Sequence, residues 1–124
     1  MKNVVTSWWV GLVMVMACQA QAADLEAGEK LFTRVCGGCH KVGPSARAAF
    51  GPELNGIFGR RAGSTEGYVY SPEMKASGIV WDREKLTAFV ADPSEVVPGT
   101  KMRLWGISDA EKVDNLLAYL ATFK

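Results

Sequence analysis

Cys36-Gly37-Gly38-Cys39-His40 is the stretch that organises the chain, because C-x-x-C-H is typical of the covalent attachment site of a c-type haem. Residues three and four positions apart share one face of a helix, so the two cysteines and the histidine can point the same way. The thiols can then form thioethers with the haem vinyl groups, while the imidazole meets the iron from one side. The two glycines place no side chain between these anchors. We therefore interpret the motif as a haem attachment site.

A redox dithiol and half of a zinc site are the other interpretations of this motif. His40 is the only histidine and Cys18 is the only further cysteine, so a closed four-ligand zinc site lacks ligands. A thioredoxin-like dithiol would need alternating strands and helices around it, and the flanking sequence lacks that alternation. Both observations favour haem attachment.

The first 22 residues have the pattern of a secretory signal peptide. Lys2 supplies a positive charge, residues 8–17 form an apolar run, and Ala20-Gln21-Ala22 offers a small-x-small cleavage site. We therefore expect residues 1–22 to be removed and residues 23–124 to form one domain in the periplasm, in agreement with haem attachment outside the cytoplasm. Two alternatives stay open: retention of the apolar run as a membrane anchor, and lipidation at Cys18.

The charge of the chain is nearly balanced. Its 14 Lys and Arg residues face 13 Asp and Glu residues, and removal of the signal peptide with Lys2 leaves the two kinds equal. A neutral domain has no broad basic surface for a nucleic acid. Any partner surface must therefore come from local patches or from apolar contact.

Helical periodicity and capping residues predict four helices and no strand, so we expect an all-α domain. The first helix covers residues 24–35, with an apolar face formed by Leu25, Gly28, Phe32 and Val35. The second is expected to begin at Ser71, the third to run from Asp82 to Asp92-Pro93, and the fourth to open at the capping box Ser108-x-x-Glu111. The apolar face of the fourth is formed by Val113, Leu116, Leu117 and Leu120.

Residues 41–61 are irregular and rich in glycine and proline, and the irregularity continues to Tyr70. So long a loop in a small domain suggests a backbone that is wrapped around something other than an ordinary core. A flat porphyrin is a suitable object for such a loop.

A haem iron bound by one histidine has a second axial position, which methionine, histidine or an open site can complete. The chain has no second histidine, and only Met74 and Met102 lie outside the predicted signal peptide. Met74 falls in a predicted helix, where a methionine commonly fills a gap in a core. Met102 follows the Pro98-Gly99 turn in a loop that can present a side chain freely. The residues alone favour Met102 and leave Met74 as the alternative.

The chain resembles a small class I cytochrome c of the mitochondrial-like group over nearly its whole length after the signal peptide, from Gly28 to Tyr119. The resemblance rests on Cys36-Gly-Gly-Cys-His40, Gly51-Pro52, Asn55-Gly-Ile-Phe-Gly-Arg60, Gly67-Tyr68, Gly78-Ile-Val-Trp81, Asp92-Pro93 and Pro98-Gly-Thr-Lys-Met102. It implies the class I cytochrome c fold, in which helices and long loops are wrapped around one covalently bound haem c.

The resemblance also implies roles for single residues. Met102 would be the sixth iron ligand opposite His40, and the Pro52 carbonyl would accept a hydrogen bond from the far ring nitrogen of His40. A buried haem propionate would be held by Arg60, Tyr70 and Trp81, with Thr100 in the same surroundings. The cofactor-binding residues so implied are Cys36, Cys39, His40, Pro52, Arg60, Tyr70, Trp81, Thr100 and Met102. The glycine and phenylalanine of the first helix, Gly28 and Phe32, would cross the last helix at Leu116 and Tyr119.

Several positions depart from the family pattern. Phe89 stands where such proteins usually have a tyrosine, Met74 where they have an asparagine, and Leu104 where an aromatic ring shields the haem edge. These changes make the methionine side of the haem more apolar. The ring of lysines around the exposed edge is thinner, since its usual sites include Val35, Ser94 and Glu95, while Lys41, Lys101 and Arg103 provide basic groups.

The sequence thus predicts a single-haem electron carrier that is monomeric, is not an enzyme and binds no small-molecule substrate. Its expected partners are a membrane cytochrome complex as donor and a terminal oxidase, reaction centre or periplasmic reductase as acceptor. Three alternatives are a haem enzyme or gas sensor in which Met102 dissociates, a dithiol oxidoreductase, and a membrane-tethered domain of a larger complex.

Overall fold

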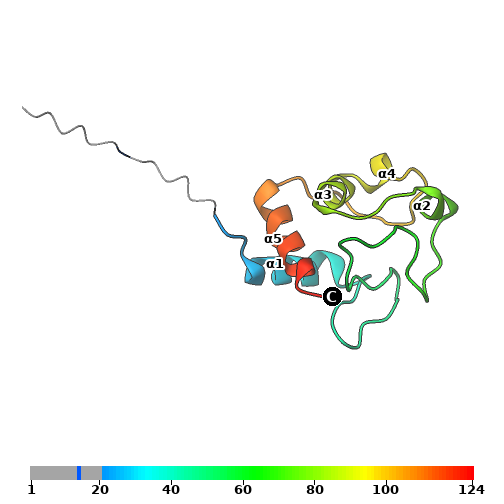
Figure 1. Cartoon of the computed structure of the whole chain (residues 1–124), viewed down its shortest axis with the longest axis horizontal. Helices are drawn as coiled ribbons and strands as arrows, with labels where there is room; N and C mark the ends of the chain where they lie inside the picture. Colours follow the sequence, from blue (N-terminus) through cyan, green and yellow to red (C-terminus); the bar gives the residue numbers. More distant parts are fainter. Residues whose placement is uncertain (1–13, 15–20) are drawn as a thin grey trace, which may run out of the picture.

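The computed structural model describes residue 14 and residues 21–124 (Figure 1). The predicted signal peptide lies almost wholly outside the described residues, including Cys18 and all of its apolar run except Met14. The elements in chain order are α1 (Leu25–Leu31), the π-helical turn η1 (Phe32–Cys36), α2 (Pro72–Ala76), α3 (Arg83–Ala91), α4 (Pro93–Val96) and α5 (Ala110–Ala121). Pairing of strand type in residues 21–124 is limited to one isolated bridge between Arg61 and Val80. The predicted all-α class is confirmed.

The first helix begins as predicted but changes its winding before the haem motif. The Asp24 carboxylate accepts a hydrogen bond from the Ala27 backbone N–H at 3.0 Å and caps α1. From Phe32 onward the helix is π-wound, and the Gly37 N–H donates to the Phe32 carbonyl, five residues back. The prediction of one continuous apolar face is therefore wrong at Val35, which is exposed, because the wider turn moves it out of phase. The N-terminal end of the face, at Leu25, is also exposed.

α1 crosses α5 at a glycine, as the resemblance implies (Figure 1). A Cβ built on Gly28 would overlap the backbone carbonyl oxygen of Asn115 and lie 2.9 Å from the Cβ of Tyr119. The rings of Phe32 and Tyr119 pack with their centroids 5.7 Å apart. The buried face of α5 contains the four residues predicted from periodicity, Val113, Leu116, Leu117 and Leu120.

The predicted cap of α5 is wrong by one residue. The Asp109 carboxylate, and not the Ser108 hydroxyl, accepts from the helix, with the Lys112 N–H 3.0 Å away. Both residue types are good caps, but the ionised carboxylate also interacts favourably with the positive end of the helix dipole.

Three short helices lie on the other side of the domain from the α1–α5 crossing (Figure 1). Ser71 caps α2 and Asp82 caps α3, both as predicted, through hydrogen bonds to residues three positions later. α3 ends where Asp92-Pro93 was expected to end it. Asp92 then caps the four-residue helix α4, with Pro93 at its first position, and this helix was not predicted. None of the helices in the described part of the chain is both long and apolar enough to cross a membrane.

Candidate haem site

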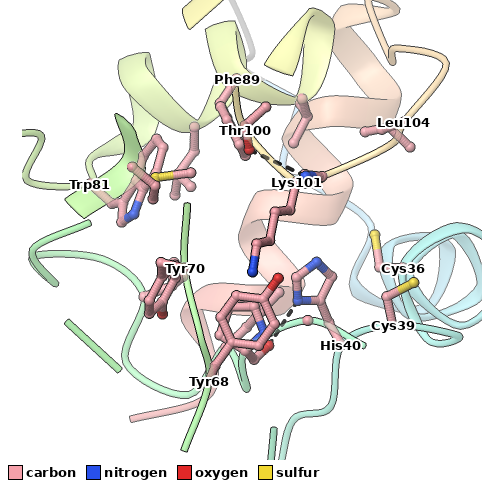
Figure 2. Close-up of a pocket in the computed structure, with 18 of the residues that line it drawn as sticks. Cys36, Cys39, His40, Tyr68, Tyr70, Trp81, Phe89, Thr100, Lys101 and Leu104 are labelled. Atoms are coloured by element: carbon pink, nitrogen blue, oxygen red, sulfur yellow. Dashed lines mark hydrogen bonds between the residues drawn. The ribbon is translucent and has the colours of Figure 1, made fainter. Parts of the chain in front are cut away.

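A cavity of about 430 Å³ lies between the irregular loop and the helices (Figure 2). This volume falls in the range of ligand pockets, and its lining is mostly apolar. The lining includes all nine residues that the sequence predicted to bind the cofactor: Cys36, Cys39, His40, Pro52, Arg60, Tyr70, Trp81, Thr100 and Met102. These residues are separated by up to 66 positions in the sequence, and the fold brings them to one space.

His40 is held in one orientation and one protonation state by the loop beside it. Its Nδ1 atom lies 2.8 Å from the Pro52 carbonyl oxygen, which can only accept a hydrogen bond (Figure 2). Nδ1 must therefore carry the proton, and the lone pair of Nε2 is free for a metal. Burial lowers the pKa of His40, although the Pro52 hydrogen bond opposes this change. The imidazole is thus neutral at pH 7, as an iron ligand must be.

The backbone around His40 is pinned to the loop on both sides. The Cys39 carbonyl accepts from the Gly51 N–H at 2.9 Å, and the Lys41 carbonyl accepts from the Leu54 N–H at 3.0 Å. Gly51 packs directly against the ring, and a Cβ built there would lie 2.6 Å from Cε1 and 2.9 Å from Nδ1 of His40. The absence of a side chain at this glycine therefore sets the position of the imidazole.

Gly51→Ala is expected to displace the His40 ring and to lower the free energy of unfolding of the haem-loaded protein by about 1–3 kcal/mol, the usual cost of overpacking. Thermal unfolding followed by circular dichroism measures the loss. Gly38→Ala is the matched control, since a Cβ there meets no atom within 4 Å. Equal stabilities of the two variants would contradict the proposed close contact.

The two cysteines lie on the same side of the cavity as His40 (Figure 2). Cys36 is half-buried and Cys39 is exposed. Burial, together with the charge of Cys39, raises the pKa of the Cys36 thiol to about 11. A dithiol oxidoreductase needs a thiol whose pKa is lowered so that it attacks as a thiolate at neutral pH. Cys36 therefore lacks the activation that a nucleophilic thiol of a dithiol oxidoreductase needs.

The loop that carries Met102 is fixed by polar contacts around a buried threonine. The Thr100 hydroxyl accepts from the Met102 N–H at 3.2 Å, and the Thr100 N–H donates to the Val97 carbonyl at 3.0 Å. The Lys101 ammonium donates to the Val69 carbonyl at 2.7 Å and so ties this loop to the opposite one. Met74 also lines the cavity, from α2, so both candidate methionines face the same space.

The predicted propionate-binding group is brought together by the backbone. The Trp81 N–H donates to the Arg60 carbonyl at 2.9 Å, which places these two residues side by side. The Arg60 guanidinium donates to Thr65 Oγ1 at 2.8 Å and to the Asn55 carbonyl, and it pairs with the Glu53 carboxylate at 3.0 Å.

Glu53 is a residue of this group that the sequence analysis missed. Its carbonyl and its carboxylate both accept from Arg60, and its second carboxylate oxygen accepts from the Asn55 N–H at 2.7 Å. The only local signal was an acid directly after Gly51-Pro52. The partner seven residues away became visible only through the path of the loop.

The methionine side of the cavity is apolar, as the sequence predicted. Phe89 is buried, and its ring packs on Trp81 with centroids 5.0 Å apart. Leu104 lines the cavity from the loop after Met102. No aspartate or glutamate lines the cavity within residues 21–124, whereas Arg60, Arg61, Lys101 and Arg103 do.

These features fit a haem group. The apolar lining suits a flat apolar ring, and the thiols and the imidazole occupy the positions that the attachment motif requires. Arginine, tyrosine and tryptophan provide donors for acidic substituents. The arrangement therefore defines a c-type haem protein.

Comparison with known proteins agrees with this class. The family model described as Cytochrome c matches residues 25–124, so the chain belongs to the cytochrome c family. It is 47% identical to cytochrome c-550 of Nitrobacter winogradskyi over 81% of this chain and 91% of that protein. It is 49% identical to cytochrome c-554 of Methylosinus trichosporium over 88% of this chain and 83% of that protein. The solved structure of cytochrome cH from Methylobacterium extorquens superposes with a TM-score of 0.74 at 44% identity, covering 81% of this chain and 99% of the other.

Membership of this family establishes the cofactor as one covalently attached haem c, and the general activity as electron carriage and not catalysis. The predicted class I fold and the predicted cofactor are confirmed.

Proposed function

We propose that this chain is a periplasmic electron carrier whose haem iron is bound by His40 and Met102 and whose haem is attached through Cys36 and Cys39. The observation that carries the proposal is the hydrogen bond from His40 Nδ1 to the Pro52 carbonyl, which leaves Nε2 free in a cavity that two thiols share. Met102 is favoured over Met74 because Thr100 holds its loop through a hydrogen bond to the Met102 N–H, and because the family resemblance implies Met102 as the sixth ligand.

The bound haem supplies a reversible one-electron change at iron. His40 is oriented by Pro52 and by the backbone bonds on either side of it, so this ligand does not reorganise when the charge changes. Thr100 holds the methionine loop in the same way. Phe89 and Trp81 exclude water from the methionine side. Arg60, Tyr70 and Trp81 would hold the buried propionate, with Glu53 keeping the guanidinium in place.

The proposed partners are a membrane cytochrome complex as electron donor and a terminal oxidase, reaction centre or periplasmic reductase as acceptor. The bacterial relatives named cytochrome c-550 and c-554 support a carrier of this type. Residues 1–22 are proposed as the export signal, with the mature monomer starting at Ala23. N-terminal sequencing of the purified holoprotein tests this, and an intact residue 1 would favour the tethered domain instead.

Carbon monoxide tests the carrier against the enzyme or sensor alternative. With both axial positions occupied by protein, the ferrous holoprotein is expected to show no rapid spectral change on addition of carbon monoxide at neutral pH. Rapid binding would mean an open or labile sixth position and would overturn the proposal.

Phe89→Tyr is expected to shift the reduction potential measurably, because it places a hydroxyl donor in a buried apolar region beside Trp81. Hydrogen bonds near the iron ligands are among the means by which a protein tunes haem potentials. Protein-film voltammetry at fixed pH measures the shift. An unchanged potential, with an unchanged unfolding temperature, would show that the hydroxyl does not reach the haem surroundings.

A further inference from the structure

Trp105 is the most exposed large apolar side chain in the described part of the chain, at 105% of its reference accessible area. A tryptophan is usually buried in large part, because its area makes exposure to water costly. It directly follows Leu104, which lines the haem cavity and is shown beside it in Figure 2. The chain therefore passes directly from a residue of the cavity lining to one whose indole is exposed to solvent.

The backbone that presents Trp105 is fixed against α3. The Ile107 N–H donates to the Val90 carbonyl at 2.8 Å. Gly106 has a φ of +97°, and a Cβ built there would overlap the Ala91 carbonyl oxygen. Only glycine allows this close approach, so the loop turns back onto α3 immediately after the tryptophan. A side chain held on a rigid backbone loses little conformational entropy when it binds a partner.

The surroundings of the cavity mouth have a distinct composition. Val35 and Phe50 are apolar residues of the cavity lining that lie at the surface of the polypeptide. Arg61, Lys101 and Arg103 are exposed on the same lining, which contains no carboxylate among the described residues. The complementary face of a partner would therefore combine an apolar recess with surrounding carboxylates.

We propose that Trp105 is the apolar docking anchor through which this carrier binds its electron acceptor, a membrane oxidase with an apolar recess bordered by acidic groups. The inference rests on the proposed carrier function and adds the residue that determines affinity. Tryptophan and arginine are the residue types most enriched among energetic hot spots of protein interfaces, and Arg103 lies two residues away. Because apolar burial is not screened by ions, the contribution of Trp105 is expected to persist at high salt, where the basic groups contribute little.

The test compares the reduced holoprotein with Trp105→Ala in one-electron transfer to a purified haem–copper terminal oxidase, followed by stopped-flow absorbance over a series of salt concentrations. We expect the second-order rate constant to fall about tenfold or more, as for loss of a hot-spot residue. The ratio of the two rate constants should stay nearly constant as salt rises. Trp105→Phe should restore most of the rate. Oxidation by ferricyanide and the reduction potential should be unchanged, because Trp105 does not line the cavity.

Leu25→Ala is the control, since Leu25 is also an exposed apolar residue but lies outside the cavity lining. Equal losses from Leu25→Ala and Trp105→Ala would overturn the inference. An unchanged rate of electron transfer to the oxidase with Trp105→Ala would also overturn the inference. If the same substitution abolished a dimer seen by sedimentation, the partner bound by Trp105 would be a second copy of this chain. A wild-type holoprotein that reacts with neither the oxidase nor a membrane cytochrome complex would instead contradict the proposed function itself.

Discussion

Met102→Ala is expected to abolish the low-spin ferrous spectrum of the holoprotein while the fold is largely retained. The thioether would be the only side-chain ligand on the side of the iron opposite His40, and alanine provides no donor atom. The covalent attachment and the α1–α5 crossing do not involve Met102, so the helical circular dichroism should change little. Visible spectra of the oxidised and reduced protein, followed by carbon monoxide addition, measure the result. The variant should bind carbon monoxide rapidly, unlike the parent.

Met74→Leu provides the matched control for this experiment. Met74 is buried on α2 and lines the same cavity, and leucine keeps most of its volume. This variant is expected to retain the low-spin spectrum and to lose less than about 1.5 kcal/mol of unfolding free energy. A low-spin spectrum that survives Met102→Ala but not Met74→Leu would reassign the ligand to Met74.

Gly28→Ala is expected to destabilise the holoprotein, although the same change normally stabilises a helix. Helix propensity alone would favour alanine by about 1 kcal/mol. At this position the added Cβ would overlap the Asn115 carbonyl oxygen and lie 2.7 Å from its carbon, so α1 and α5 must separate. Overpacking of this kind against backbone, which cannot rotate away, is expected to cost about 1–3 kcal/mol net.

Denaturant unfolding of the holoprotein measures the change in the free energy of unfolding. A decrease means that overpacking outweighs the gain in helix propensity, and an increase means the reverse. Glu29→Ala is the control, because Glu29 is an exposed α1 residue next in sequence, where the change should stay within about 0.5 kcal/mol. A more stable Gly28→Ala protein would show that the two helices are not in close contact at this glycine.

The features predicted correctly from the sequence are those that depend on a few neighbouring residues. Asp24, Ser71 and Asp82 each cap a helix because the side chain bonds a backbone N–H three positions later. The buried face of α5 could be predicted because Val113, Leu116, Leu117 and Leu120 repeat at the helical period within one segment. The same locality explains the error at Ser108, since two good caps adjoin each other and the periodic pattern does not choose between them. The helix α4 also has a local signal, because Asp92-Pro93 followed by Glu95 is a typical helix start.

The π-wound turn, the Arg60–Glu53 pair and the exposure of Trp105 could not be predicted in this way. The turn is a change of winding that a 3.6-residue period does not contain, and the ion pair depends on the path of the irregular loop. The exposure of Trp105 depends on the path of its loop, which lies against α3 at Gly106 and Ile107.

By itself the sequence determined the haem attachment motif, two thiols and an imidazole at C-x-x-C-H spacing, and it predicted a methionine as the second axial ligand. These are properties of residue type and short-range spacing, which hold in any fold that keeps the motif. The tertiary structure alone decided that Gly51 packs against the His40 ring, that Glu53 holds Arg60, and that the indole of Trp105 faces solvent. The reason is physical, because these contacts depend on distances of a few ångströms between loops, and chain topology sets such distances.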